Sequence, residues 1–161
     1  MNPATEQQRI EQAFPQVGRW VITAFPPGWM YVPGFGIRQM PVSQGQVMAN
    51  VGLGEDVTGG APLAEYIGKQ TKMMEQHLKD PKIAGPQGTG FAGAEEAQLL
   101  MVRHAPGAGE SMLHVQIYIR VGEWIGIVTL TTAEAQVREV RPAYDYFVKG
   151  LRMKAGDAGG R

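Results

Sequence analysis

Two apolar runs near the C-terminus, 112–120 and 124–132, constrain the fold more than any other feature of this sequence. In the first run hydrophobic and more polar residues alternate, which places every second side chain on the same face of a strand. The second run is rich in β-branched residues, which favour strands. Residues 121–123 are enough for a short turn between them. We therefore predict an antiparallel hairpin with this set in a core: Leu113, Val115, Ile117 and Ile119.

The rest of the chain adds strands and two helices to this hairpin. Strands are predicted at 20–25, 29–32, 35–40, 46–53 and 97–104, and helices from Pro62 to Leu78 and from Pro142 onward. The order of strands, helix, strands and helix predicts the α+β class, with a curved antiparallel sheet and helices packed on one face. Ile117 from the hairpin and Phe147 from the last helix are expected to be buried.

The length of 161 residues suits one domain, for which we predict the range 20–153. Residues 1–19 are expected to form a flexible lead, because their apolar positions are few. Residues 154–161 are polar and glycine-rich and are expected to form a disordered tail.

Charge and composition weigh against several classes of function. Fifteen Lys and Arg balance fifteen Asp and Glu, so the basic surplus of a nucleic-acid-binding protein is missing. No apolar run reaches the length of a membrane span, and the first 20 residues do not resemble a signal peptide. We therefore expect no nucleic-acid partner, no direct membrane insertion and a cytoplasmic location. The absence of cysteine fits a reducing compartment.

The residues that could carry catalysis are few and scattered in the sequence. The three histidines, His77, His104 and His114, show no helical metal-site spacing. Ser43 and Ser111 stand in no nucleophile motif. We predict a protein that is not an enzyme and that has no cofactor and no metal site.

The predicted sheet carries more apolar surface than two helices can cover. The 124–132 run, for example, has hydrophobic residues on both of its faces. An exposed apolar face commonly marks a partner site. A homodimer interface or the N-terminal arm folded over the sheet are the alternatives.

The arrangement of these segments resembles that of DcrB-related proteins, which have a PsbP-like fold. The resemblance covers about residues 20–153 and is greatest to the effector-associated (Eag) chaperones of type VI secretion. It rests on the segment Ala-Pro-Leu-Ala-Glu-Tyr-Ile-Gly-Lys-Gln at 61–70, the helix to Leu78, the glycine-rich turn 90–93, the strand through Leu100, Gln-Ile-Tyr-Ile at 116–119, Ile-Val-Thr-Leu-Thr-Thr at 127–132, and the closing helix.

The resemblance implies a chaperone that shields the N-terminal transmembrane helices of an effector protein in a concave groove of its sheet. It also implies a homodimer. Matched strand by strand, the client-binding positions of the family fall on Gln116 and on Ala49, Val51 and Leu53. We expect Met112 and Tyr118 to add apolar cover around Gln116.

Three alternatives stay open at this point. The first is that Gln116 only forms hydrogen bonds to the next strand or to water. The second is that the chain is a non-enzymatic binding or immunity-type protein that caps a soluble partner. The third alternative is a hydrolase or a small-ligand protein with a pocket near His104 and His114.

Overall fold

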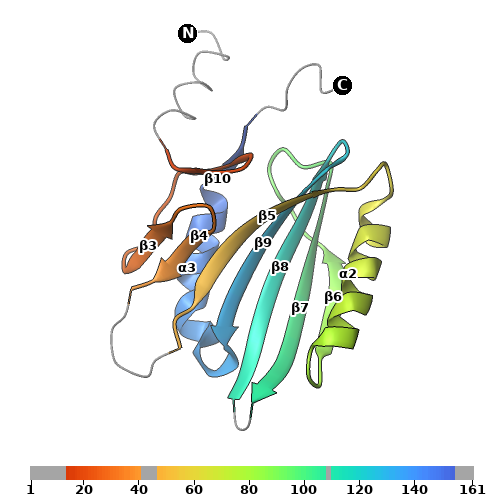
Figure 1. Ribbon diagram of the computed structural model, residues 1–161. Coiled ribbons are helices and arrows are strands. Elements are labelled where there is room, and N and C mark those ends of the chain that lie inside the picture. The colour runs from red at the N-terminus through yellow and green to blue at the C-terminus, as the bar shows by residue number, and fades with distance from the viewer. Residues whose placement is uncertain (1–13, 41–46, 108–109, 155–161) are drawn as a thin grey trace.

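A seven-stranded antiparallel sheet forms the centre of the computed structural model, which describes residues 14–40, 47–107 and 110–154 (Figure 1). The strand order is β3-β4-β5-β9-β8-β7-β6. The bounds are β3 Trp29–Val32, β4 Gly36–Gln39, β5 Asn50–Val57, β6 Lys82–Gly88, β7 Glu96–Gly107, β8 Glu110–Val121 and β9 Trp124–Ala133. The predicted hairpin is confirmed as β8 and β9, which pair from Met112↔Ala133 to Val121↔Trp124.

A second, smaller sheet joins the two ends of the described chain. Its order is β1-β2-β10, with β1 Gln16–Val17, β2 Trp20–Ile22 and β10 Leu151–Met153. The Lys154 amide also donates to the Arg19 carbonyl at 2.7 Å. The predicted flexible lead is therefore wrong for residues 16–19, which belong to the folded domain. Residues 1–13 and 155–161 lie outside the described residues.

The helix α3, Val137–Lys149, covers one face of the central sheet. A 3₁₀ turn, Glu134–Gln136, leads into it from β9. Its buried side chains pack against the inward set of the hairpin: Val140, Tyr144 and Phe147 against Leu113, Val115, Ile117, Val128 and Leu130. Ile117 and Phe147 are buried, as predicted.

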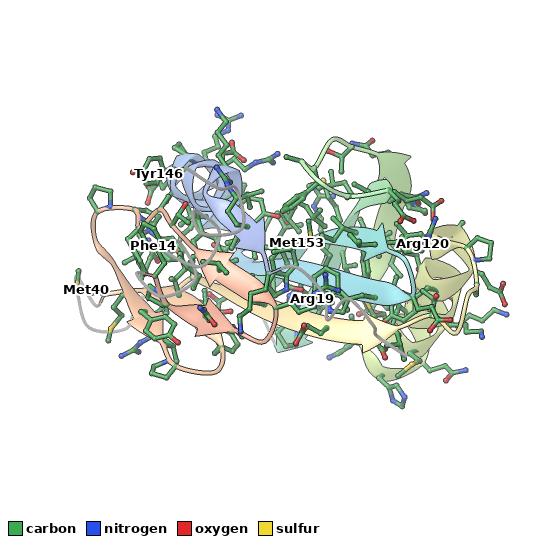
Figure 2. All side chains as sticks on the ribbon, turned by 90° about the horizontal axis from the view of Figure 1, so that it is seen from above. Phe14, Arg19, Met40, Arg120, Tyr146 and Met153 are labelled. Carbon is green, nitrogen blue, oxygen red and sulfur yellow. The ribbon has the colours of Figure 1, made fainter. Side chains whose placement is uncertain are left out.

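The helix α2, Leu63–His77, lies on the opposite face of the sheet. Its Leu63, Tyr66 and Ile67 pack on Leu100, Val102, Tyr118 and Ile125. Leu100 is the partner of Gln116, and Val102 is the partner of His114, so these side chains point away from Val115 and Ile117. Seen from above, Tyr146 of α3 lies on one side of the sheet, and Arg120 lies beside α2 (Figure 2).

The α+β class and the antiparallel sheet are confirmed, but the two helices do not share a face as expected. The apolar residues on both faces of β9 explain this difference, because each face meets its own helix. Ile125 packs under α2, whereas Val128 and Leu130 pack under α3.

Several predicted boundaries were wrong. The strand predicted at 46–53 is β5, which continues through Gly54 to Val57 because it pairs with β9 along that whole length. The last helix begins at Val137, before Pro142. The strand β6 was missed, because its second half reads as a glycine- and proline-rich turn. None of the helices among the described residues is long and apolar enough to cross a membrane.

Candidate functional site

The candidate site lies on the same face of the central sheet as α2, in the part that the helix does not cover. It is called the open face here. It is defined by seven residues of β5, β8 and β9: Asn50, Gly52, Gly54, His114, Gln116, Thr129 and Thr131. The register places them together, because Gly52 faces Thr129 across β5 and β9, and Gln116 faces Thr129 across β8 and β9. All seven are half-buried, and none belongs to the cluster beneath α2.

A hollow of about 290 Å³ lies on this face. It is lined by Phe35, Asn50, Gly52, Leu53, Gly54, Ile127, Thr129 and Thr131, none of which is charged. Phe35 forms one wall of the hollow. A Cβ atom added to Gly52 would come within 3.1 Å of the Phe35 ring, so the glycine leaves room for the aromatic wall. A Cβ atom on Gly54 would make only ordinary contacts, the nearest at 3.7 Å.

Gln116 is held by its neighbours on the same face. Its Oε1 accepts a hydrogen bond of 2.7 Å from the Tyr118 hydroxyl, and its Nε2 approaches Thr129 Oγ1 at 3.4 Å. Tyr118 is only 1% exposed and packs under α2, and this burial raises the pKa of its phenol to about 12. The carbonyl end of Gln116 is thus fixed, while the second N–H of its amide has no partner among the described residues.

The six predicted client-binding residues do not all lie on the open face. Gln116 does, and Met112 shares its face further along β8, where it is half-buried. Tyr118 also shares that face but lies under α2. The prediction is wrong for Ala49 and Val51, which are fully buried in the α3 cluster.

Strand alternation explains this correction. Val51 pairs with Leu130 on the α3 side, and its neighbours Asn50 and Gly52 point to the open face instead. Leu53 is 8% exposed and borders the hollow, although its side chain belongs to the α3 cluster. The glycines of β5 were not predicted as site residues, although the alternation in the sequence would have found them.

Polar contacts fix α2 beside the open face. The Tyr66 hydroxyl donates to Asp56 Oδ2 at 2.7 Å, and this bond holds the pKa of the Asp56 carboxyl below its usual range. Near the start of the helix, Glu96 accepts hydrogen bonds from the Arg120 guanidinium and, at 3.4 Å, from the Leu63 amide. Its hydrogen bond with Arg120 is the main cause of a lowered pKa at Glu96. α2 is therefore a fixed wall of this face.

His104 and His114 meet on the same side of the sheet, at the far end of β7 and β8. Their Nε2 atoms are 2.8 Å apart, and His114 Nδ1 lies 3.0 Å from Thr131 Oγ1. Burial, together with the nearby His104 ring, lowers the pKa of His114. The sequence analysis named both histidines in its third alternative, and the register explains why they meet: His104 faces Met112, one step along the same face from His114.

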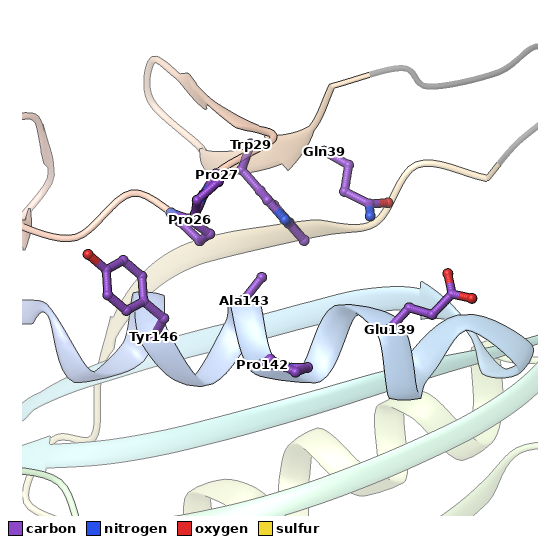
Figure 3. A pocket seen from close by; sticks show the side chains of 8 residues that line it. All are labelled: Pro26, Pro27, Trp29, Gln39, Glu139, Pro142, Ala143 and Tyr146. Carbon is purple, nitrogen blue, oxygen red and sulfur yellow. The ribbon is translucent and has the colours of Figure 1, made fainter.

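A larger hollow, of about 610 Å³, lies on the other side of the molecule (Figure 3). Trp29 and Gln39 face Ala143 and Tyr146 of α3 across it, with Pro26, Pro27 and Pro142 nearby and Glu139 at one end. A single carboxylate without a neighbouring base or nucleophile in this lining gives no basis for acid–base chemistry. Within the described ranges, no group of three or more His, Asp or Glu side chains is placed to hold a metal ion together.

The comparisons with known proteins find similarity in structure alone. No protein-family model matches the sequence, and no curated protein sequence matches it significantly. A Pseudomonas aeruginosa protein of unknown function, PA94, matches with a TM-score of 0.57 and 23% identity over 81% of this chain and 79% of that one.

Two further solved structures match at similar coverage. LpqN of Mycobacterium tuberculosis, which is involved in cell envelope biogenesis, has a TM-score of 0.64 and 12% identity over 87% of each chain. The cyanobacterial PsbP protein of Synechocystis sp. PCC 6803, CyanoP, has a TM-score of 0.53 and 13% identity over 86% of this chain and 94% of that one. At these identities the likeness concerns the fold, and that fold is PsbP-like.

Proposed function

We propose that this protein is a cytoplasmic, non-enzymatic chaperone of type VI secretion that shields the N-terminal transmembrane helices of an effector on its open face. The observation that carries the proposal is the uncharged hollow floored by Gly52 and Gly54 and walled by Phe35. A transmembrane helix satisfies its own backbone but needs cover for its side chains in water. The resemblance of this chain to the effector-associated chaperones supports the same assignment.

The composition of the open face suits a helix better than an irregular peptide. Glycines let another backbone approach closely, and the side chains of Asn, Gln and Thr form hydrogen bonds between helices in the same setting. Gly54 supplies the first property, and Gln116 and Thr129 supply the second. A helix with small or polar residues on one side would therefore fit here.

Along β5 the open face extends over five residues, 50–54, which is about 17 Å at the rise of a β-strand. A membrane-spanning helix of about 20 residues is about 30 Å long. The face of one chain would therefore cover about half the length of one such helix.

The chaperone is proposed to act as a homodimer, because two copies can cover more client surface than one and dimers are the commonest closed assembly. Light scattering of the purified chain at micromolar concentration should give twice the mass of one chain. If the chain is a strict monomer and still binds the client, the homodimer is refuted, but the proposal that the open face binds the client is not.

The test of client binding compares two glycine-to-glutamate variants. Gly54→Glu places a carboxylate on the open face, and Gly88→Glu places one on β6, where a Cβ atom meets nothing within 4 Å. The client is an effector fragment with N-terminal transmembrane helices, which is co-expressed with this chain and captured without detergent. Gly54→Glu should weaken capture at least about tenfold, which equals about 1.4 kcal/mol, whereas Gly88→Glu should bind as the parent does.

Two results would overturn the proposal. One is a parent chain that fails to keep the fragment soluble. The other is equal capture by both variants, since the client would then lie elsewhere. If the parent instead binds the soluble part of the effector and ignores the helices, the protein is a capping or immunity-type partner.

A further inference from the structure

The proposed function gives no chemical role to the pair His104 and His114, although His114 is one of the residues of the open face. Both side chains are half-buried and lie on the α2 side of the sheet, one on β7 and one on β8. The rings are nearly parallel, at 9°, with centroids 4.9 Å apart. Their Nε2 atoms are much closer, at 2.8 Å, so the rings meet through their nitrogen edges and not through their faces.

Two imidazoles in this arrangement can share only one proton between them. One Nε2 donates and the other accepts, which directs both nitrogens at the same point in space. We propose that this point is a binding site for a divalent transition metal that prefers imidazole, such as Zn²⁺, Ni²⁺ or Cu²⁺, with His104 Nε2 and His114 Nε2 as its two protein ligands. The inference does not rest on the proposed chaperone function.

The geometry needs little change to accept the ion. Zinc–nitrogen bonds of about 2.0–2.1 Å in a tetrahedral site place two ligand nitrogens about 3.3 Å apart. The present separation is 2.8 Å, so the rings have to part by about half an ångström. His104 stands at the end of the regular pairing, directly before a register shift between His104 and Gly107, where the strand is least constrained.

A second observation supports the assignment of His114 as a ligand. Its Nδ1 lies 3.0 Å from Thr131 Oγ1 on the neighbouring strand. When Nδ1 is the donor of this hydrogen bond, the lone pair is left on Nε2, and metal-bound histidines are commonly held in this way. Thr131 thus acts as a positioning residue that orients the ring.

One open space lies beside His104. It is a hollow of about 260 Å³ that does not reach His114 and is lined also by Asp80, Lys82, Arg103, Ala105, Ser111 and Glu134. The adjacent cation Arg103 is engaged by Glu134 at 2.6 Å. The two histidines supply two ligands, and water fills the other coordination positions. We expect Cu²⁺ to bind more tightly than Zn²⁺ or Ni²⁺.

The experiment titrates the tag-free full chain with Zn²⁺ while the imidazole resonances of its three histidines are followed by NMR. The resonances of His104 and His114 should shift together and saturate at one equivalent, and those of His77, which is exposed on α2, should stay in place. Calorimetry with Ni²⁺ and Cu²⁺ provides affinities. Thr131→Val should weaken binding by about tenfold or more, and His104→Gln or His114→Gln should weaken it further, with His77→Gln as the matched control.

The folded state of each variant is checked by its thermal melt before titration. Zinc that shifts His77 first, or a His104→Gln variant that keeps the parental affinity, would overturn the proposal. Failure of all three ions to move the His104 and His114 resonances would also overturn it and leave a simple hydrogen-bonded pair. The chaperone assay uses Gly54→Glu, which leaves both histidines intact, so the two proposals fail independently.

Discussion

The Tyr118 hydroxyl donates a 2.7 Å hydrogen bond to Gln116 Oε1, two residues earlier on the same face of β8. The phenol is almost fully buried under α2, and the amide lies on the open face. The bond therefore joins the helix-covered part of the sheet to the part that we propose binds the client. It also means that Gln116 contributes to the stability of the fold, apart from any role in binding.

Gln116→Ala is expected to lower the free energy of unfolding by about 1–3 kcal/mol, because it leaves the buried Tyr118 hydroxyl without a partner. The double variant Gln116→Ala with Tyr118→Phe removes both partners and should recover part of that loss. Urea unfolding of the two single variants and the double variant gives the coupling energy. Effects that add within about 0.5 kcal/mol would show that the two side chains act independently.

The interface between the hairpin and α3 should respond strongly to truncation. Ile117→Ala and Phe147→Ala each remove buried contacts from the α3 cluster and should cost about 2–5 kcal/mol. Tyr146→Ala is the matched control, since Tyr146 is the neighbouring aromatic residue on the same helix and is 53% exposed. A loss at Tyr146 equal to that at Phe147, measured by chemical denaturation, would contradict the placement of this face.

The sequence could predict the central hairpin and α2, because both carry strong periodic patterns. The alternation in 112–120 identified the buried set, and the stripe beginning at Leu63 identified the helix. Short strands were not predicted, because two or three residues are too few to show an alternation of apolar and polar positions. β1 and β10 are examples: they exist only because they pair with β2.

The faces of the strands were predicted unevenly. The alternation of β8 placed Gln116 on the face opposite Val115 and Ile117, where the structure has it, whereas the choice of Val51 followed the family resemblance, and Val51 is buried in the α3 cluster. The contact between His104 and His114 depends on the register of β7 against β8. Alternation alone does not give register, since the length of the connecting turn decides it.

Gly126 is expected to tolerate no side chain. A Cβ atom there would lie 2.5 Å from ring atoms of both Trp20 and Trp124, whose rings pack at 5.4 Å between centroids. Gly126→Ala should therefore cost about 1–3 kcal/mol through overpacking. Gly68→Ala is the contrasting variant, because it lies in α2 with open space around it and should gain up to about 1 kcal/mol. Thermal melts that move in the same direction for both variants would contradict this account.

Tyr144 is expected to be replaceable by phenylalanine without loss. Its side chain is 2% exposed in the α3 cluster, and its hydroxyl has no hydrogen-bond partner among the described residues. Burial raises the pKa of this phenol above its usual range, so the hydroxyl is neutral at physiological pH. Tyr144→Phe should leave stability unchanged or raise it by about 1 kcal/mol, since it removes an unpaired buried polar group. A clear drop in the melting temperature would contradict this account.

The stability of the protein should depend on pH through His114. Burial and the nearby His104 lower its pKa in the folded state, whereas the unfolded chain has the ordinary value of about 6.5. Between these two values the unfolded state binds more protons than the folded state, so stability falls as the pH falls. This contribution is fully present above the unfolded pKa and is lost as the pH drops toward the folded pKa.

Urea unfolding at several values between about pH 7.5 and pH 5.5, the range in which histidine titrates, measures this slope. The parent should lose stability toward the acid end, and His114→Gln should lose less, because glutamine keeps a polar group near Thr131 but does not titrate. His77→Gln, at an exposed position of α2, is the control for the substitution itself. Parallel curves for the parent and His114→Gln would show that the buried imidazole is not a source of the acid sensitivity.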